Sequence, residues 1–232
     1  VAWYLPIAAA SGGFGRLPSP GAVGVVEVGV TLGTIVATAA AFLLFLRALD
    51  LGEVSYVAPI SKIIPVFVLP IEVLVLHERL TPLEVSGVVI ATLAVYVANY
   101  RSGPLLEPIR KAATARSAQF ALASAASFAL GDVGKRLVLQ EFGIPLTVWV
   151  PLLLGGVLVV VLPLALREWV PLRHAAPRFV LAGGGVAVAE HATSLAFSLV
   201  PASVASPIIN TQAVVAVVLG GVVLREEAFG IR

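Results

Sequence analysis

The stretch that decides the fold is VSYVAPISKIIPVFVLPIEVLVLHERL, residues 54–80. It recurs without a gap as ASVASPIINTQAVVAVVLGGVVLREEA, residues 202–228, at a constant offset of 148 residues. Pro59 therefore matches Pro207, and Ser55 matches Ser203. Each copy is an apolar run that begins near a Ser-x-x-x-Pro pattern and closes near a glutamate. A repeated unit of this kind is typical of an internally duplicated membrane protein.

The composition also indicates a membrane protein. Hydrophobic residues make up 59% of the 232 residues and charged residues 12%, whereas about a quarter of a soluble domain is charged. The apolar residues fall into blocks of about 18–25, the length of helix that crosses a hydrocarbon core of about 30 Å. We therefore expect an all-α polytopic membrane protein. Its spans in this chain are Gly21–Leu46, Val54–Leu76, Leu83–Tyr100, Ala118–Leu139, Pro145–Leu166, Phe179–Leu199 and Ser203–Leu224.

The repeat divides the chain into two halves. Residues 1–100 are the expected first repeat, residues 101–117 a basic linker with helix breakers, and residues 118–232 the second repeat. The constant offset maps Ala118–Leu139 to positions before residue 1, and it maps Leu83–Tyr100 to positions that run past the end of the chain. We therefore expect a ten-helix parent of five plus five helices, with terminal helices missing here. The first repeat is then truncated at its N-terminal side and the second at its C-terminal side.

The sequence gives little support for an enzyme, a metal site or a nucleic-acid-binding protein. The chain has no cysteine, which excludes disulfides and thiolate chemistry, and a net charge of +2 gives no reason to expect nucleic acid. His77-Glu78 begins like a zinc-protease motif, but Thr81 replaces the second histidine, and no strand precedes the glycines around Lys135. We expect no metal, no cofactor and no enzymatic activity. Glycine clusters at 155–156, 183–185 and 220–221 are more typical of close helix packing than of ligand binding.

Polar side chains inside the expected spans are the strongest functional clue, because a charge at the bilayer centre costs at least about 2.5 kcal/mol by insertion scales. Such groups normally face a bundle interior or a wet cavity. They are Lys62, Glu72, Asp132, Lys135, Glu190, His191, Asn210 and Gln212. Asp132, Lys135 and Arg136 fall in the last turns of a span, and we expect them at the membrane interface, as we expect of Glu27 near the start of its span.

Lys62 lies about a third of the way into its span, on a helical stripe that is repeated in the second copy. Pro59 and Pro207 each lack a backbone donor, and we expect them to break the helix just before them and to free carbonyls there. A symmetric pocket between the halves follows, with Lys62 on one wall and Asn210 on the other. The stripe reads Ser55, Pro59, Lys62, Val66 and Leu69 in the first copy, and Ser203, Pro207, Asn210, Val214 and Val217 in the second.

The pocket hypothesis has an alternative, in which Lys62 forms a structural ion pair with Glu72, Glu190 or Asp132. The distance along the helix argues against Glu72 as a direct partner, since ten residues of helix rise about 15 Å. The expected substrate-binding set is Lys62, Asn210, Ser55, Ser203, Gln212, Glu190 and His191. His191 can also carry a proton, because its unperturbed pKa lies near neutrality, although Glu190 can instead hold it charged.

These residues resemble the EamA half-domain of the drug/metabolite transporter superfamily. The resemblance rests on the runs Ala48–Ile60, Pro65–Phe67 and His77–Pro82, with a weaker second copy from Ala196 to Gly230, and it covers nearly the whole chain. It implies two inverted five-helix repeats around a central cavity, and transport of small metabolites by alternating access. The chain departs from the family in its missing outer helices and in His77, which stands where the family usually has a small residue.

Two classes of function are therefore carried forward. The first is a secondary transporter of the cell membrane, a multi-pass exporter or exchanger of a small polar metabolite. Its expected partners are the metabolite, the lipid bilayer, and a proton or counter-substrate, and its organisation is compatible with a homodimer. The alternative is a lipid-carrier flippase or a non-transporting membrane scaffold. A flippase should offer a groove open to lipid, whereas a metabolite carrier needs an enclosed polar cavity.

Overall fold

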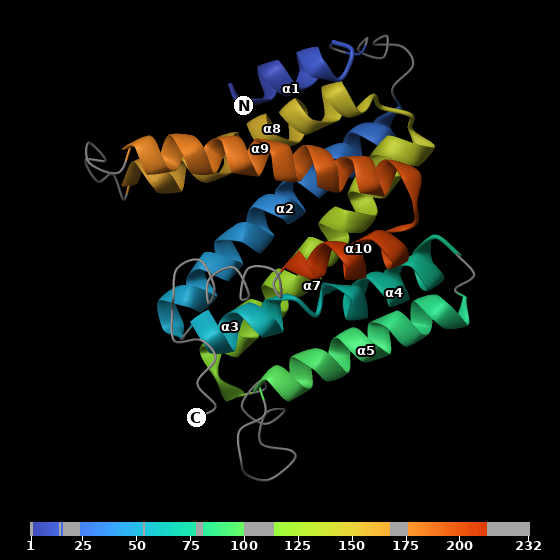
Figure 1. Cartoon of the computed structure of the whole chain (residues 1–232), viewed down its shortest axis with the longest axis vertical. Coiled ribbons are helices and arrows are strands. Elements are labelled where there is room, and N and C mark those ends of the chain that lie inside the picture. Colours follow the sequence, from blue (N-terminus) through green and yellow to red (C-terminus); the bar gives the residue numbers. More distant parts are fainter. Residues whose placement is uncertain are drawn as a thin grey trace. The chain divides into compact units, whose positions relative to one another are not determined.

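The computed structural model describes residues 2–13, 15, 24–52, 54–77, 81–99, 114–167 and 176–212, and every regular element in these ranges is a helix (Figure 1). The helices of the first part of the chain are α1 (Tyr4–Ala10), α2 (Val25–Leu51), α3 (Val54–Ser61), α4 (Ile64–Val75) and α5 (Pro82–Asn99). Those of the second part are α7 (Arg116–Arg136), the π-helical turn η1 (Leu137–Glu141), α8 (Leu146–Arg167), α9 (Ala176–Leu199) and α10 (Ala202–Asn210).

Three described helices, α2, α8 and α9, are long and apolar enough to cross a membrane on length and composition. Only 22%, 22% and 11% of their apolar windows are buried within the protein. Most of each window is therefore not buried, and its exposed side chains include leucines and valines, which suit contact with lipid chains. They correspond to three of the expected spans. The expected span Ser203–Leu224 can be followed only as far as Gln212, because the residues after it lie outside the described part.

The sequence repeat is reproduced in the helix boundaries. Helix α2 ends at Leu51 and α9 ends at Leu199, while α3 begins at Val54 and α10 begins at Ala202. Both pairs are separated by the same 148 positions as the sequence copies. The two copies therefore share a long helix, a two-residue break and a short helix that carries the repeated proline.

The expected single span Val54–Leu76 is wrong in one respect, because the structure divides it into α3 and α4. The interruption falls at Lys62 and Ile63, not before Pro59, through which α3 runs. Ile63 donates its N–H to the Ile60 carbonyl at 3.3 Å, which closes α3 with a tighter turn. Pro65 then occupies the first turn of α4, where a missing N–H leaves no intrahelical bond unmade.

Helix α10 likewise runs through Pro207 and ends later, at Asn210. Thr211 donates its N–H to the Ile208 carbonyl at 3.1 Å, which is the bond equivalent to Ile63–Ile60 in the first copy. At this helix end, side chains donate hydrogen bonds to backbone carbonyls of the last turn. Asn210 Nδ2 donates to the Ser206 carbonyl at 2.7 Å, and Thr211 Oγ1 donates to the Ile208 carbonyl at 2.7 Å.

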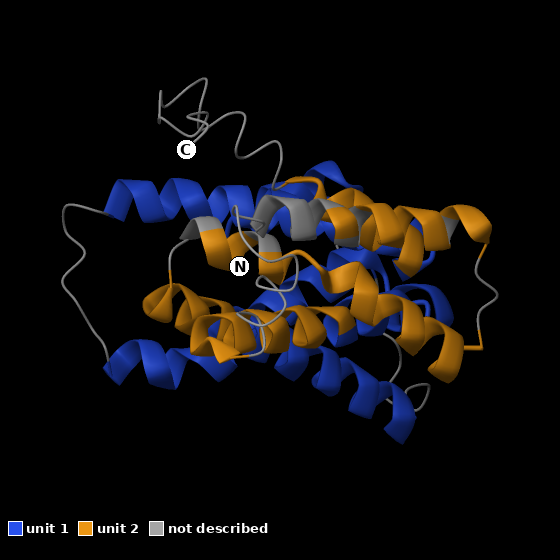
Figure 2. Ribbon diagram, turned by 90° about the horizontal axis from the view of Figure 1, so that it is seen from below, with its two compact units in different colours: residues 1–43, 130–202 blue, residues 44–129, 203–232 orange. Residues whose placement is uncertain are grey.

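The chain forms two compact units that cut across the sequence repeats (Figure 2). Unit 1 contains Val1–Leu43 and Leu130–Ala202, and unit 2 contains Leu44–Ala129 and Ser203–Arg232. Helices α2 and α7 contribute to both units. The expected division into repeats at residues 1–100 and 118–232 is a division of the sequence, and it stays a prediction.

Unit 1 is held together by close helix contacts and a few large side chains. Trp149, Tyr4, Phe197 and Leu153 are fully buried there. Helix α7 approaches α2 through small residues: a Cβ atom added at Gly131 would lie 2.9 Å from Thr38 Oγ1, and one at Gly134 would collide with Thr34. The glycines around Lys135 thus serve helix packing.

The expected packing role of the other glycine clusters holds in part. An added Cβ at Gly156 would lie 2.6 Å from Ile35 Cγ2, whereas Gly155 has no neighbour within 4 Å. Gly183 and Gly184 lie at ordinary contact distance from the Trp3 ring, and nothing lies within 4 Å of Gly185. Gly220 and Gly221 lie outside the described residues.

Unit 2 has a small apolar core formed by Ala48, Val57, Ile60, Ala118 and Ala121. Helices α3 and α4 both pack against α5. The start of α10 contacts α4 through a hydrogen bond between Ser203 and Glu72. The short helices that carry Lys62 and Asn210 are therefore part of one compact unit.

Candidate functional site

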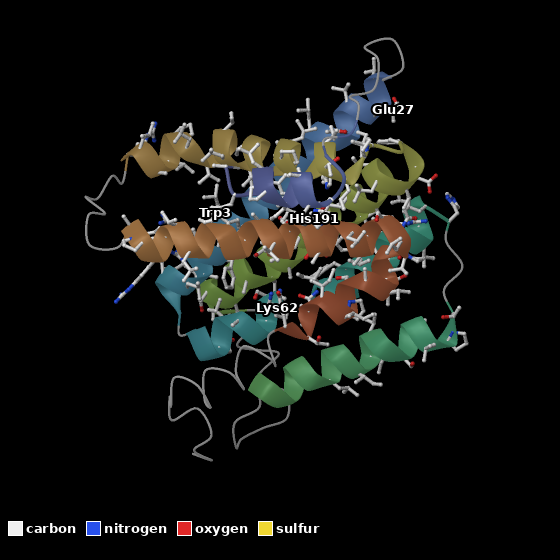
Figure 3. The ribbon with its side chains drawn as sticks, turned by 45° about the horizontal axis from the view of Figure 1, so that its top comes forward. Trp3, Glu27, Lys62 and His191 are labelled. Carbon is white, nitrogen blue, oxygen red and sulfur yellow. The ribbon has the colours of Figure 1, made fainter. Side chains whose placement is uncertain are left out.

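Lys62 lies at the interruption between α3 and α4, where it is half-buried. Figure 3 labels Lys62 at this position, and Figures 1 and 3 both show the final turn of α10 close to the interruption. Asn210 is the last residue of α10 and is also half-buried. The structure thus places the ammonium and the carboxamide predicted from the repeat at equivalent helix ends within unit 2.

The other predicted residues of unit 2 have different surroundings. Ser203 is 1% exposed and its backbone N–H donates to Glu72 Oε2 at 2.9 Å, so it lies in a helix contact. Its Oγ is buried without a hydrogen-bond partner in the described structure. Gln212 is exposed. The side chains of Ser55 and Pro59 lie outside the described part, and the substrate-binding role of this set stays a prediction.

Glu72 lies on α4 in the same unit, although it was not among the substrate-binding residues predicted from the sequence. It is completely buried on α4, and its carboxyl oxygen receives the N–H of the second residue of α10. Helix N-termini present unsatisfied N–H groups and a partial positive charge, so a carboxylate there is favourable. Glu72 therefore ties the first repeat to the broken-helix region of the second. The sequence feature that could have identified Glu72 was its carboxyl group inside an apolar span.

This contact gives a stability prediction. Glu72→Leu should lower the thermal midpoint of the purified protein, because a buried N–H of α10 would lose its acceptor at a cost of about 1–3 kcal/mol. Glu72→Gln keeps an acceptor oxygen and should be milder. Asp50→Asn is the control, since that side chain is 67% exposed in a surface pair with Arg47. Equal midpoints for Glu72→Leu and the wild type would contradict the contact.

Glu190 and His191 lie in unit 1, where they belong to a second group of polar side chains. The Lys135 ammonium lies 2.8 Å from Glu190 Oε1, and the two side chains are 5% and 19% exposed. Ser194 Oγ donates to the same carboxylate oxygen at 3.2 Å. The Lys135 ammonium also lies 6.0 Å from the centre of the Phe197 ring. Glu190 is therefore already held by a buried cation.

Asp132, Lys135 and Arg136 do not extend to the protein surface as expected, because all three side chains are buried. The reason lies in the packing of the end of α7. The helix continues into η1, which packs against α9 and α8. Gln140 of η1 donates from Nε2 to the Phe197 and Val200 carbonyls at 2.8 and 3.0 Å, which satisfies the end of α9. This cover keeps the end of α7 inside the unit.

His191 contacts α1 instead of the ion pair. Its Nδ1 lies 2.9 Å from the Tyr4 hydroxyl, and the two rings lie 5.7 Å apart between centroids. Tyr4 Oη also lies 3.4 Å from the Leu146 carbonyl oxygen at the start of α8. Figure 3 shows His191 on α9 and Glu27 near the start of α2, away from it. Tyr4 was not predicted, because nothing in its local sequence indicates a histidine 187 residues away.

The predicted site residues therefore form two groups. Lys62, Asn210, Ser203 and Gln212 lie in unit 2, whereas Glu190 and His191 lie in unit 1. The first group lies at repeated helix ends, which are positions where transporters expose backbone groups to a substrate. In the second group Glu190 is paired with the buried Lys135, and His191 contacts the Tyr4 hydroxyl. The two groups differ enough in construction to suggest different roles.

The chain is thus a membrane protein built on an internal repeat, and every regular element in its described part is a helix. The family model of the EamA-like transporter family matches residues 4–100 and 116–230, and the chain belongs to this family. It is accordingly a membrane transporter of the drug/metabolite superfamily. Comparisons with curated proteins and with solved structures find no match.

Proposed function

We propose that this protein is a secondary transporter of the cell membrane that exports or exchanges a small polar metabolite by alternating access. In this proposal the chain is a multi-pass protein built on two inverted five-helix repeats. Lys62 and Asn210 are its principal substrate-binding residues. The family supports the class of protein, and the chemistry of these two residues supports a polar cargo.

The observation that carries the proposal is that α3 ends at Ser61, next to Lys62, and that α10 ends at Asn210, the position that corresponds to Lys62 in the repeat. Broken helices at corresponding positions of two repeats mark the substrate sites of inverted-repeat transporters, because their ends present unused backbone groups. Lys62 adds an ammonium with three donors, and Asn210 adds a carboxamide. Such a site suits a small molecule with at least one anionic or carbonyl acceptor.

Transport by the purified protein in liposomes tests this proposal. Labelled amino acids, amines and sugar derivatives are screened for saturable movement, with and without an imposed pH gradient. Saturable movement of a metabolite supports the proposal. Movement of a fluorescent phospholipid without any metabolite would replace it with the flippase alternative, and movement of neither would favour a scaffold.

Lys62→Ala should reduce transport about tenfold or more at normal folded yield, because a hydrogen bond to a charged group is worth about 1.5–3 kcal/mol. Initial rates at several substrate concentrations measure the effect. Arg47→Ala is the matched control, since it also removes a cation, from a surface pair in which Arg47 is 69% exposed. Unchanged transport, or loss of folded protein, would show that Lys62 is not a binding residue.

A further inference from the structure

A group of polar side chains in unit 1, some buried and some half-buried, is not used by the proposed substrate site. We define the α9 cluster as Tyr4, Asp132, Lys135, Glu190 and His191. These side chains come from α1, α7 and α9, which are far apart in the sequence and close in unit 1. Ionisable groups buried in a membrane protein commonly mark ion pathways or proton relays. The cluster contains one histidine, the residue type that most often carries protons near neutral pH, namely His191.

The contacts of His191 suit both of its protonation states. In the neutral ring, Nδ1 accepts the hydrogen of the Tyr4 hydroxyl at 2.9 Å. When a proton is added to Nδ1, that N–H donates to Tyr4 Oη. The tyrosine hydrogen can then turn to the Leu146 carbonyl oxygen, which lies 3.4 Å from Oη. The Tyr4 hydroxyl hydrogen and the Nδ1 hydrogen therefore each have an acceptor when a proton is added to Nδ1.

Charged side chains also lie on α9, on η1 and on the end of α7. Helix α7 contributes Asp132, Lys135 and Arg136, η1 contributes Glu141, and α9 contributes Glu190. Glu141 is 57% exposed, whereas the Lys135 and Glu190 side chains are 5% and 19% exposed. Arg136 lies 3.9 Å from Glu141, and Lys135 lies 2.8 Å from Glu190. The remaining charged residues in the described part of unit 1 lie near helix ends; they are Glu27, Arg167 and Arg178.

We propose that His191 binds the proton that is coupled to transport, with Tyr4 as its hydrogen-bond relay and the Lys135–Glu190 pair as fixed counter-charges. This proposal rests on the proposed transport function. It assigns the proton and the metabolite to different residues, the α9 cluster for the proton and the helix ends at Lys62 and Asn210 for the metabolite. It also removes Glu190 and His191 from the substrate-binding set.

Proton binding can be measured without any substrate. The chain has three histidines, and ¹⁵N-histidine NMR of the detergent-solubilised protein follows each one between about pH 5 and 8. The signal that disappears in His191→Asn belongs to His191, and His77→Asn assigns the exposed His77 in the same way. We expect the His191 signal to change from neutral to protonated over this range. A His191 ring that keeps one protonation state throughout would overturn the proposal.

Coupling is measured in liposomes with a metabolite found in the transport screen. An imposed pH gradient should stimulate the wild type, and His191→Asn should abolish the stimulation while exchange at equal concentrations on both sides continues. Tyr4→Phe should weaken the stimulation, because it removes only the relay hydroxyl. His77→Asn is the matched control and should behave as the wild type. His77 has a φ of 55°, a conformation that asparagine tolerates.

The outcomes separate this proposal from the function on which it rests. Stimulation that survives in His191→Asn would overturn the coupling role, although transport itself would stand. A wild type that moves no metabolite would overturn the proposed function and the coupling role together, while the NMR titration would still decide whether His191 binds a proton.

Discussion

Lys135→Ala is expected to lose most of the folded protein. The Lys135 ammonium and the Glu190 carboxylate form a 2.8 Å ion pair that is almost closed to the surroundings. Removing one partner of a buried pair typically costs about 3–5 kcal/mol, because the other charge stays buried without compensation. The loss should be visible as a lower yield of monodisperse protein in detergent and as a lower thermal midpoint.

A double variant separates the charge effect from the packing effect. Lys135→Met combined with Glu190→Met removes both charges and keeps side chains of similar length, so it should recover part of the lost stability. Recovery is expected to be incomplete, because Asp132 also interacts electrostatically with Lys135. If Lys135→Ala alone were as stable as the wild type, the ion pair would not hold α7 to α9.

The sequence predicted the start of α3 at Val54 and the end of α9 at Leu199, but it placed the start of α10 one residue late, at Ser203, and the end of α2 five residues early, at Leu46. Apolar runs of membrane-crossing length predict helices, and the constant offset between the copies predicts that their ends correspond. Leu51 and Leu199 end the matched helices α2 and α9, and Val54 and Ala202 begin α3 and α10. These are the parts of the fold for which no distant contact has to be known.

The position of the helix interruption was predicted wrongly because the wrong proline was chosen. Pro59 lies inside α3, and the helix passes through it. Pro65 is the proline that marks the boundary, because it lies in the first turn of α4, where no N–H is needed. In the second copy no proline follows Asn210, and side-chain bonds from Asn210 and Thr211 accompany the end of α10. A rule based on proline alone could not find both endings.

The buried state of the α7 end could not be read from the sequence either. Lys135 lies near the end of its span, where a long side chain can usually reach water. Its burial depends on η1 and α9, and its partner Glu190 is 55 residues away. No helical spacing relates the two residues. The correct signal was weaker: an intramembrane carboxylate and an intramembrane ammonium each need a partner, and each can satisfy the other.

The close approach of α7 to α2 leads to the second large effect, a loss of folded protein in Gly134→Leu. An added Cβ at Gly134 would lie 3.0 Å from both Thr34 Cβ and Cγ2 and would collide with Thr34 Oγ1. Thr34 cannot easily move away, because its hydroxyl donates to the Val30 carbonyl at 2.7 Å. Overpacking of this kind costs about 1–3 kcal/mol or more. Folded yield and the thermal midpoint measure it.

Gly155→Leu is the matched control for Gly134→Leu. It makes the same change within a long helix, so both variants share the roughly 1 kcal/mol gain from removing a helical glycine. No atom lies within 4 Å of an added Cβ at Gly155, so no clash opposes that gain. The difference between the variants therefore reports helix contact alone. Adding Thr34→Ala to a Gly134→Ala variant should restore part of its stability, because the hydroxyl that collides with the new methyl is gone. Equal stability of Gly134→Leu and Gly155→Leu would mean that α7 and α2 do not meet at Gly134.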